Sequence, residues 1–331
     1  MRACRRRIPP LLPLLLAALA GPGRAAEPPV SLDTANLSPV AQVFGLPRLT
    51  QGPGPGGATR AGLEVDWASH AVSDRDGAAF VRFDGETRRY TLTAVGRLPG
   101  RRAGWWALEA PYVQHTGGTL DDLIDRWHRA LGLPRGDRPD RPHNKLLYRV
   151  VDDSGQVLLD RTGTAAGPGD LALSAGLPLA GPLSAGLRLE APTGDADRLL
   201  GSGSWDAAGW LAATGAAGAT GAWPWHAAGG AMAMTGGDVL PSLQRRWATF
   251  ARLAGGWRPL PGLVLRAQLD GHTPLYRSPL VPLGSPALEL RLGAAWHPGG
   301  GYRLAAGFSE DPAVGTAPDI TFHLRLSRGR L

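Results

Sequence analysis

The stretch Leu63-Glu64-Val65-Asp66-Trp67 decides the fold, because apolar and charged residues alternate along it. A period of two puts successive side chains on opposite faces of a β-strand. Similar segments recur at 90–94, 106–110, 187–190, 263–270, 288–292, 302–304 and 320–326, with weaker Ala- and Gly-rich ones at 170–178, 205–213, 222–230 and 247–257. Long helices cannot dominate a chain with 47 Gly and 30 Pro in 331 residues. We therefore predict an all-β fold of about 12 strands.

The connections between these segments alternate in length. Short ones cover 98–104, 179–182, 214–221, 258–262 and 298–301, and longer, more polar ones cover 71–88, 116–169, 192–204, 231–246, 271–284 and 309–317. Short turns at one end, long loops at the other and an even strand number are typical of outer-membrane barrels. We expect an antiparallel transmembrane β-barrel over residues 60–331, with both termini at the periplasmic side and the longest loop, about 116–169, outside the cell.

Charged side chains occupy the strand face opposite Leu, Val and Trp. That face would line the lumen of a barrel or meet water in a soluble sandwich, and periodicity alone leaves both open. Trp257, Trp296 and Tyr302 beside short turns favour a barrel, since aromatic residues gather at membrane interfaces. The expected lumen-facing charges are Glu64, Asp66, Glu109, Arg188, Glu190, Arg266, Asp270, Glu289, Arg291, Arg303 and Arg325. Because acids and arginines are roughly balanced, we favour ion pairs that fill a narrow interior over a selectivity filter.

The N-terminus carries the pattern of a secretory signal peptide. Arginines within residues 1–7 precede an uncharged run, 8–20, which is too short for a membrane anchor. Cleavage sites follow Ala20 and Ala25, and we prefer the second because Glu27 follows shortly. The predicted signal peptide is therefore residues 1–25, and residues 26–59 are expected to form an N-terminal periplasmic segment.

Cleavage changes the charge and removes the only thiol. Five arginines leave, so the 35 basic residues fall to 30 against 28 acidic ones, and the formal charge falls from +7 to +2. A nearly neutral mature chain gives no reason to expect nucleic acid as a partner. Cys4 leaves as well, which excludes disulfides and thiolate metal sites in the mature chain.

Residues 207–237 contain no Asp, Glu, Lys or Arg, which makes them a candidate for a transmembrane helix. The segment holds eight glycines and Pro224, and Leu211 is its only Leu, Ile, Val or Phe. Each Gly and Pro disfavours a helix. We therefore predict two mildly apolar strands joined near 214–221.

One amphipathic helix is expected in the longest loop, from Thr119 or Leu120 to Leu133. Aspartates crowd its first turns, and Gly132 and Pro134 end it. Its apolar face comprises Leu120, Leu123, Ile124, Trp127 and Leu131. We expect this face to be buried at or in the barrel mouth, where the helix either caps the loop or serves as a lid.

Catalytic signals in the sequence are weak. His115, beside Thr116-Gly117-Gly118, is the best single candidate for a lipid-modifying enzyme, but no Gly-x-Ser-x-Gly elbow accompanies it. Asp195 and Asp197 have a spacing that could suit a cation, although a solvated turn is the preferred interpretation. The remaining histidines show no metal-ligand spacing. We expect no cofactor and no metal, and the sequence favours a non-enzymatic role over an enzymatic one without deciding between them.

Several segments resemble an uncharacterised family of proteobacterial outer-membrane proteins, domain-of-unknown-function family 3187. The matching segments are 38–47, 83–87, 111–118, 125–134, 169–171 and 191–195, and beyond 203 the likeness is mainly one of pattern. The resemblance implies an outer-membrane barrel and brings no known activity, substrate or catalytic residue. One departure concerns the C-terminus, since such barrels commonly end on an aromatic residue and this chain ends Ser327-Arg328-Gly329-Arg330-Leu331.

Three functions remain open on these observations. We favour a passive channel or surface-binding barrel in the outer membrane of a Gram-negative bacterium. The alternatives are an outer-membrane lipid-modifying enzyme and a soluble periplasmic β protein. The expected partners are outer-membrane lipid, the barrel-assembly machinery during biogenesis and a small solute, and the chain is expected to be a monomer.

Overall fold

The computed structural model describes residues 32, 35–49, 59–100, 104–131, 143–218, 221–312 and 315–329. Within these ranges it leaves out the side chains of four residues, Leu123, Trp127, His128 and Leu131. The predicted signal peptide, 1–25, lies outside the described residues, as do the predicted helix end at Gly132 and Pro134 and the last two residues, 330–331.

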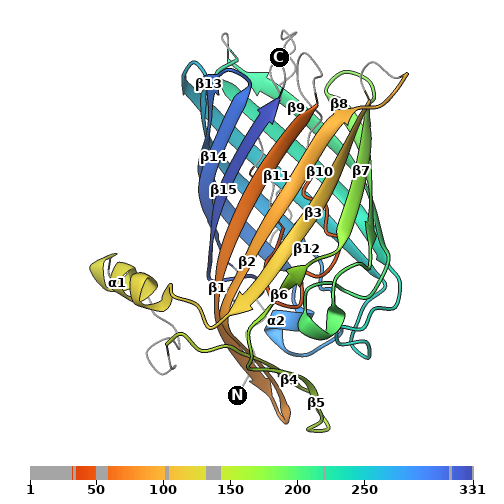
Figure 1. Ribbon diagram of the computed structural model, residues 1–331, viewed down its shortest axis with the longest axis vertical. Helices are drawn as coiled ribbons and strands as arrows, with labels where there is room; N and C mark the ends of the chain where they lie inside the picture. The colour runs from red at the N-terminus through yellow and green to blue at the C-terminus, as the bar shows by residue number, and fades with distance from the viewer. Residues whose placement is uncertain are drawn as a thin grey trace, which may run out of the picture.

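Twelve antiparallel strands close a barrel (Figure 1). Each strand pairs with the next along the chain, and β1 pairs with β15 to close the wall. The strands are β1 (Arg60–Asp76), β2 (Ala79–Arg97), β3 (Trp105–Thr116), β7 (Leu171–Pro178), β8 (Leu183–Ala191), β9 (Asp206–Ala217), β10 (Trp223–Met234), β11 (Trp247–Leu260), β12 (Leu263–His272), β13 (Ala287–Gly299), β14 (Tyr302–Glu310) and β15 (Ile320–Gly329). The predicted fold class is confirmed, and the soluble sandwich is excluded.

The two ends of the barrel differ as the connection lengths predict. Short turns join β7 to β8, β9 to β10, β11 to β12 and β13 to β14 at the end where β1 begins and β15 finishes. This short-turn end is at the top of Figure 1. The opposite, long-loop end carries the smaller elements: α1 (Asp121–Leu131), β4 (Leu147–Val151), β5 (Val157–Arg161), β6 (Ala165–Pro168), η2 (Ala196–Arg198) and α2 (Val281–Gly284). No helix among the described residues has the length and apolar character needed to span a membrane.

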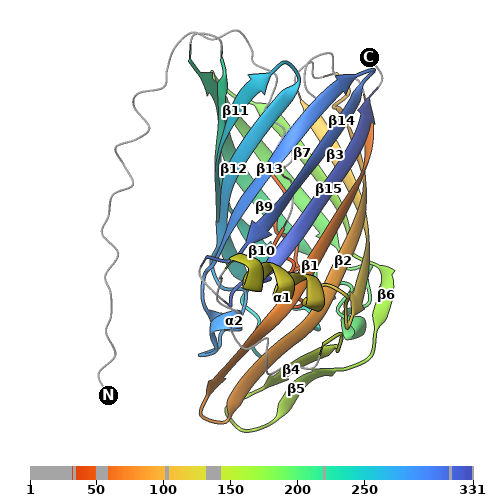
Figure 2. The ribbon, with the colours of Figure 1, turned by 90° about the vertical axis from the view of Figure 1, so that its left-hand side faces the viewer.

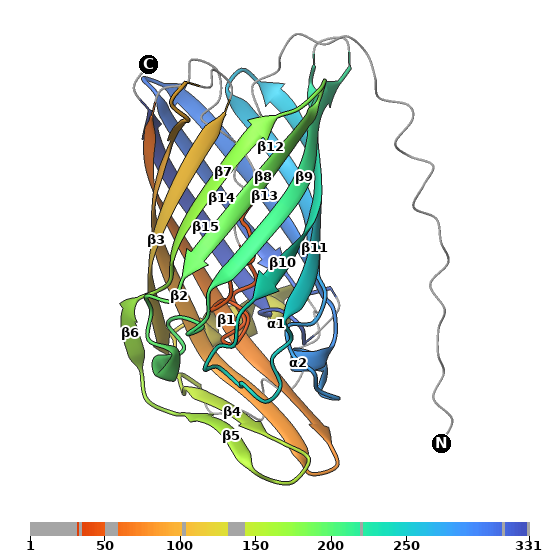
Figure 3. The same cartoon turned by 90° about the vertical axis from the view of Figure 1, so that its right-hand side faces the viewer.

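The expected loop 71–88 is instead a continuation of the wall. β1 and β2 stay paired as far as Asp76 and Ala79, so their hairpin extends beyond the rest of the barrel (Figure 3). β4 pairs with this extension, and β5 pairs with β4. The extension forms because Val81 and Phe83 are buried in an apolar cluster with residues of β4 and of the long loops, which compensates for the polar residues at its tip.

The helix α1 lies beside the barrel at the long-loop end and does not cover the mouth (Figure 2). This corrects the expected position. Leu120 and Ile124, on the predicted apolar face, are buried, whereas the side chains of Leu123, Trp127 and Leu131 lie outside what the structure describes. The start of the helix is tied to β2, because the N–H groups of Thr119 and Leu120 both donate to Glu86 Oε1 at 2.6 Å. This anchor on the wall holds the helix to one side.

The outer surface of the wall is apolar and carries aromatic residues near both ends. Leucines face outward on most strands, and Leu92, Leu187 and Leu253 are each more than 60% exposed. Trp257, Trp296 and Tyr302, the expected girdle residues, are exposed at the short-turn end, and Trp257 stacks on Trp223. Trp247 is exposed at the other end of β11. Ten residues of a strand tilted by about 40° span roughly 25 Å, the height of a lipid-facing band.

The described part of the N-terminal segment lies inside the barrel. Residues 35–49 form no strand, yet nearly all of their side chains are buried. Part of this segment is visible in red behind the wall strands in Figure 3. Residues 26–59 were expected to form a segment on the periplasmic side, and for 35–49 the structure differs. We call residues 35–49 the lumen segment.

Candidate functional site

The lumen segment begins at the long-loop end of the barrel. The side-chain amide of Asn36 donates to the Thr316 carbonyl at 3.0 Å and contacts His272 Nε2 at 3.1 Å. Asn36 Oδ1 accepts from the N–H of Ser38, which starts a compact turn over residues 38–42. Asn side chains commonly fix turns in this way. The segment is therefore a defined turn anchored to the end of β12 and to the loop before β15.

Apolar side chains of the lumen segment pack under the long loops. Val40, Val43, Phe44 and Leu46 join one cluster with residues of β2, β4 and the loops after β10 and β12. The ring of Phe44 lies 5.7 Å from that of Tyr276, whose hydroxyl donates to the Val40 carbonyl at 2.8 Å. Burial raises the pKa of Tyr276, so this hydroxyl keeps its proton. The cluster therefore packs the lumen segment against the long loops.

Backbone and side-chain groups of the lumen segment make hydrogen bonds to wall strands and to one long loop. The Gly45 N–H donates to Asp206 Oδ2 at 2.8 Å. Arg89 Nη1 donates to the Gln42 carbonyl at 3.0 Å, and Gln42 Nε2 donates to the Leu199 carbonyl at 2.7 Å. Arg252 Nη1 donates to the carbonyl of Arg48 at 2.8 Å. The segment is therefore attached to strands around the barrel by hydrogen bonds, without joining its sheet.

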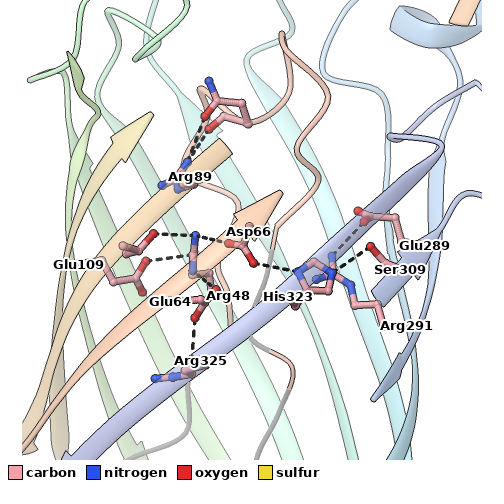
Figure 4. A network of polar contacts seen from close by, with 12 residues as sticks. Arg48, Glu64, Asp66, Arg89, Glu109, Glu289, Arg291, Ser309, His323 and Arg325 are labelled. Atoms are coloured by element: carbon pink, nitrogen blue, oxygen red, sulfur yellow. Dashed lines mark hydrogen bonds and ion pairs between the residues drawn. The ribbon is translucent and has the colours of Figure 1, made fainter. Parts of the chain in front are cut away.

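The side chain of Arg48 ends among three carboxylates of the wall (Figure 4). Its guanidinium pairs with Glu64, lies 3.6 Å from Asp66 Oδ2 and 3.4 Å from Glu109 Oε2, and donates to Thr91 Oγ1 at 3.2 Å. Glu64 and Asp66 come from β1, Thr91 from β2 and Glu109 from β3, which are adjacent strands. We call Glu64, Asp66 and Glu109 the carboxylate site.

Wall residues complete a first ion-pair network around the carboxylate site. Arg188 contacts both Glu109 and Glu190 at 2.9 Å. His323 Nδ1 lies 2.8 Å from Asp66 Oδ1, and Arg325 lies 3.9 Å from Glu64. These side chains face inward because they share the parity of the site on strands of alternating pattern.

A second network lies on β11, β12 and β13. Asp270 is contacted by Arg252 at 2.5 Å and by Arg291 at 2.6 Å, and Arg291 also contacts Glu289 at 3.2 Å. Gln268 Nε2 donates to Asp270 Oδ2 at 2.7 Å and also to the carbonyl of Leu32 at 3.1 Å. The N-terminal chain is therefore tied to this network too.

The structure brings most of the expected lumen charges into these two networks. Glu64, Asp66, Glu109, Arg188, Glu190 and Arg325 lie in the first, and Asp270, Glu289 and Arg291 lie in the second. Arg266 is buried on β12, and Arg303 is half-buried on β14, both at positions of inward parity.

Sequence reasoning missed several lumen residues. Arg89 and Arg252 share strand parity with buried neighbours and could have been found by extending the alternation along β2 and β11. Arg48 lies in a Pro- and Gly-rich stretch with no periodicity, so the sequence offered no signal for its position.

Two tryptophans fill the interior nearer the short-turn end. Trp105 on β3 and Trp210 on β9 are buried at inward positions, and their rings lie 6.5 Å apart. Trp210 lies flat over Gly186 of the neighbouring strand, where a Cβ atom would meet the ring at 2.2 Å. The glycine therefore makes room for the ring inside the wall.

His115 makes hydrogen bonds to neutral groups. Its Nε2 donates to the Leu199 carbonyl at 3.0 Å, so Nδ1 of the neutral ring accepts from Thr87 Oγ1, also at 3.0 Å. His70 Nε2 lies 2.8 Å from the same hydroxyl. Asp121 and Asp122, the carboxylates that follow His115 in the sequence, contact Asn144 and His143. This geometry lacks the carboxylate that orients a catalytic histidine.

Asp195 and Asp197, the candidate cation ligands, lie at a short helix instead. Asp195 caps η2, where its Oδ1 accepts from the N–H of Arg198 at 3.2 Å, and Asp197 lies within that short helix. Among the described residues, no group of three or more His, Cys, Asp or Glu is placed to hold a metal ion.

The sequence matches the family model of a protein of unknown function, DUF3187, over residues 11–329. The chain belongs to this family. No curated protein matches the sequence.

Solved structures share the barrel fold of this DUF3187 member. The crystal structure of the COG4313 outer membrane channel from Pseudomonas putida F1 is similar with a TM-score of 0.53 and 20% identity, covering 83% of this chain and 96% of that one. The P. putida toluene transporter TodX matches with a TM-score of 0.37 and 12% identity, covering 83% and 91%. The first likeness shows that the fold is that of outer-membrane barrels of Gram-negative bacteria.

Proposed function

We propose that the protein is an outer-membrane channel that the lumen segment keeps closed in the conformation described. One observation carries the proposal: a segment of chain occupies the barrel interior, attached to the wall by hydrogen bonds and ion pairs and not by sheet pairing. These hydrogen bonds and ion pairs can be replaced by others when the segment moves, while the strand pairing of the barrel wall stays intact. The charged face that would then line the pore is already in place on the strands.

The proposal includes the route to the membrane. Residues 1–25 would direct export and be cleaved, after which the barrel-assembly machinery would insert the strands into outer-membrane lipid. The exposed leucines and two aromatic zones of the wall support contact with lipid. We further propose a monomer that passes a small solute, with no role for nucleic acid.

The test is single-channel conductance in a planar bilayer. We expect the full mature chain to conduct rarely and the variant lacking residues 35–49 to show a stable, larger conductance. A matched control removes residues 153–156, the exposed turn between β4 and β5, and should conduct as rarely as the full chain. If the variant lacking the lumen segment folds and stays silent, the channel proposal is wrong.

A surface-binding role is the second candidate. The extended β1–β2 hairpin with β4 and β5 forms a sheet that projects beyond the long-loop end (Figure 1). A folded barrel that remains silent without its lumen segment would favour this role. In that case removal of 147–161 should abolish binding of whole cells to a surface ligand.

A further inference from the structure

We propose that the carboxylate site binds a small organic cation bearing a guanidinium or primary ammonium group, and that Arg48 occupies this site in place of the solute. The inference rests on the proposed channel function and names the class of solute. Arg48 and the solute would compete for the same acceptors. Release of the lumen segment would then depend on the concentration of the cation.

The site belongs to the wall and would remain when the segment leaves. Its acceptors, Glu64, Asp66, Thr91 and Glu109, come from three neighbouring strands that are paired along their length. Glu64 is 2% exposed, Asp66 is fully buried and Glu109 is 2% exposed. The strands fix the spacing of these groups, so a cation of suitable size would meet an arrangement already formed.

Removing Arg48 leaves the site short of positive charge. Arg325 lies 3.9 Å from Glu64, and Arg188 is shared between Glu109 and Glu190. His323 pairs with Asp66, and Arg89 donates to Gln42 of the lumen segment. The three carboxylates of the site and Glu190 would then face three arginines, Arg188, Arg325 and Arg89, together with His323. Buried carboxylates that lose a partner are strongly destabilised, so departure of Arg48 favours entry of another cation.

The present occupant does not use every acceptor of the site. Asp66 Oδ2 and Glu109 Oε2 are buried and accept no hydrogen bond from Arg48, although both lie within 3.6 Å of its guanidinium. A free cation can rotate to donate to these oxygens, whereas Arg48 is held by its backbone at Arg252. Planar guanidinium groups suit paired carboxylates because they donate in a fork.

An organic cation fits the site better than a metal ion. Within the described ranges, no three carboxylates or histidines converge as metal ligands would. The carboxylates instead surround a group with several N–H donors, and Thr91 supplies an additional neutral acceptor. The chemistry of the site therefore points to nitrogen donors.

The experiment is chemical rescue of Arg48→Ala in the full mature chain. The probe is methylguanidinium at millimolar concentration, with methylurea as its neutral isostere, and the readout is the midpoint of thermal unfolding of the barrel in detergent. We expect methylguanidinium to raise the midpoint of R48A saturably and to leave wild type unchanged, because wild type carries its own guanidinium. Methylurea should raise neither.

Additional substitutions in the R48A background test whether methylguanidinium binds at the carboxylate site. In R48A/D66N/E109Q the apparent affinity for methylguanidinium should fall at least ~10-fold, because two charged acceptors are lost. The control R48A/D160N changes an exposed carboxylate on β5 and should keep the affinity of R48A. If R48A does not fold, R48Q takes its place. Equal responses to the two probes, or equal responses of R48A and wild type, overturn the inference.

A conductance measurement separates this inference from the channel proposal. In the variant lacking residues 35–49, the reversal potential in a salt gradient should indicate cation preference, and E64Q/D66N/E109Q should remove that preference. A variant that conducts without cation preference overturns the cation site and leaves the channel standing. A silent variant overturns the channel, while the rescue of R48A still reports on the site.

Discussion

The main-chain N–H of Gly45 donates to Asp206 Oδ2 across 2.8 Å, so the backbone of the lumen segment contacts β9 directly. A Cβ atom at position 45 would lie 3.0 Å from Asp206 Cβ and 3.2 Å from Glu190 Cβ. Two wall strands therefore crowd this point, and a branched side chain would not fit there without displacing the segment. Because the contact is so close, a substitution at position 45 tests whether this contact holds the segment in place.

Gly45→Val should raise the open probability of the channel. The added methyl groups would overlap atoms of Asp206 and Glu190, and such overlap typically costs about 1–3 kcal/mol, enough to shift the segment out of its position. Single-channel recording measures the effect. The control is Gly255→Val on β11, where a Cβ meets open space. A G45V protein as closed as wild type would mean that this contact does not hold the segment.

A disulfide between the segment and the wall should lock the channel closed. The pair Gly45→Cys and Glu190→Cys places two Cβ atoms near the separation that a disulfide needs. The only native cysteine, Cys4, lies in the predicted signal peptide and does not interfere. Under oxidising conditions the spontaneous openings should disappear, and dithiothreitol should restore them. Each single cysteine variant serves as a control and should ignore the reductant. Openings that persist in the verified disulfide form would contradict a role for segment movement.

Tyr276→Phe should loosen the segment without disturbing the wall. The variant loses the hydrogen bond to the Val40 carbonyl and leaves that buried carbonyl without its donor, which costs about 1 kcal/mol. We expect a roughly fivefold rise in the released fraction, measured as protease cleavage within 35–49. Tyr302→Phe removes a hydroxyl from the exposed outer surface and should leave cleavage unchanged. Equal cleavage of Y276F and wild type would show that the hydrogen bond contributes nothing to retention.

The wall was predictable from the sequence because its cause is local. The alternation of apolar and charged residues around Leu63–Trp67 predicts which side chains face lipid. The same alternation places Glu109, Arg188 and Arg291 in the interior. Even the charge-free segment 207–237 was correctly predicted to form strands, now seen in β9 and β10. The face on which each strand residue lies follows from its immediate neighbours in the sequence, so it can be predicted without knowing the distant contacts.

The contents of the lumen were not predictable, because they depend on contacts between distant parts of the chain. Arg48 meets Glu109 and Arg252 only after the barrel has closed. Residues 38–47 even supplied part of the family resemblance, yet their turn and apolar side chains indicate no location by themselves. The helix α1 was expected at the mouth for the same reason: its amphipathic pattern predicts a buried face, whereas its position is set by Glu86 on β2.

His115→Ala should lower stability and leave any lipid-modifying activity unchanged. The imidazole joins the Leu199 carbonyl of a long loop to Thr87 of β2, and both would lose a partner that water cannot readily replace in the buried site. Two such losses predict a destabilisation of about 1–3 kcal/mol. The thermal unfolding midpoint measures it, with His143→Ala on the exposed surface as the control. Phospholipase and acyl-transfer assays on the same samples test the enzyme hypothesis. Measurable activity in wild type that disappears in a folded H115A barrel would support the enzyme hypothesis.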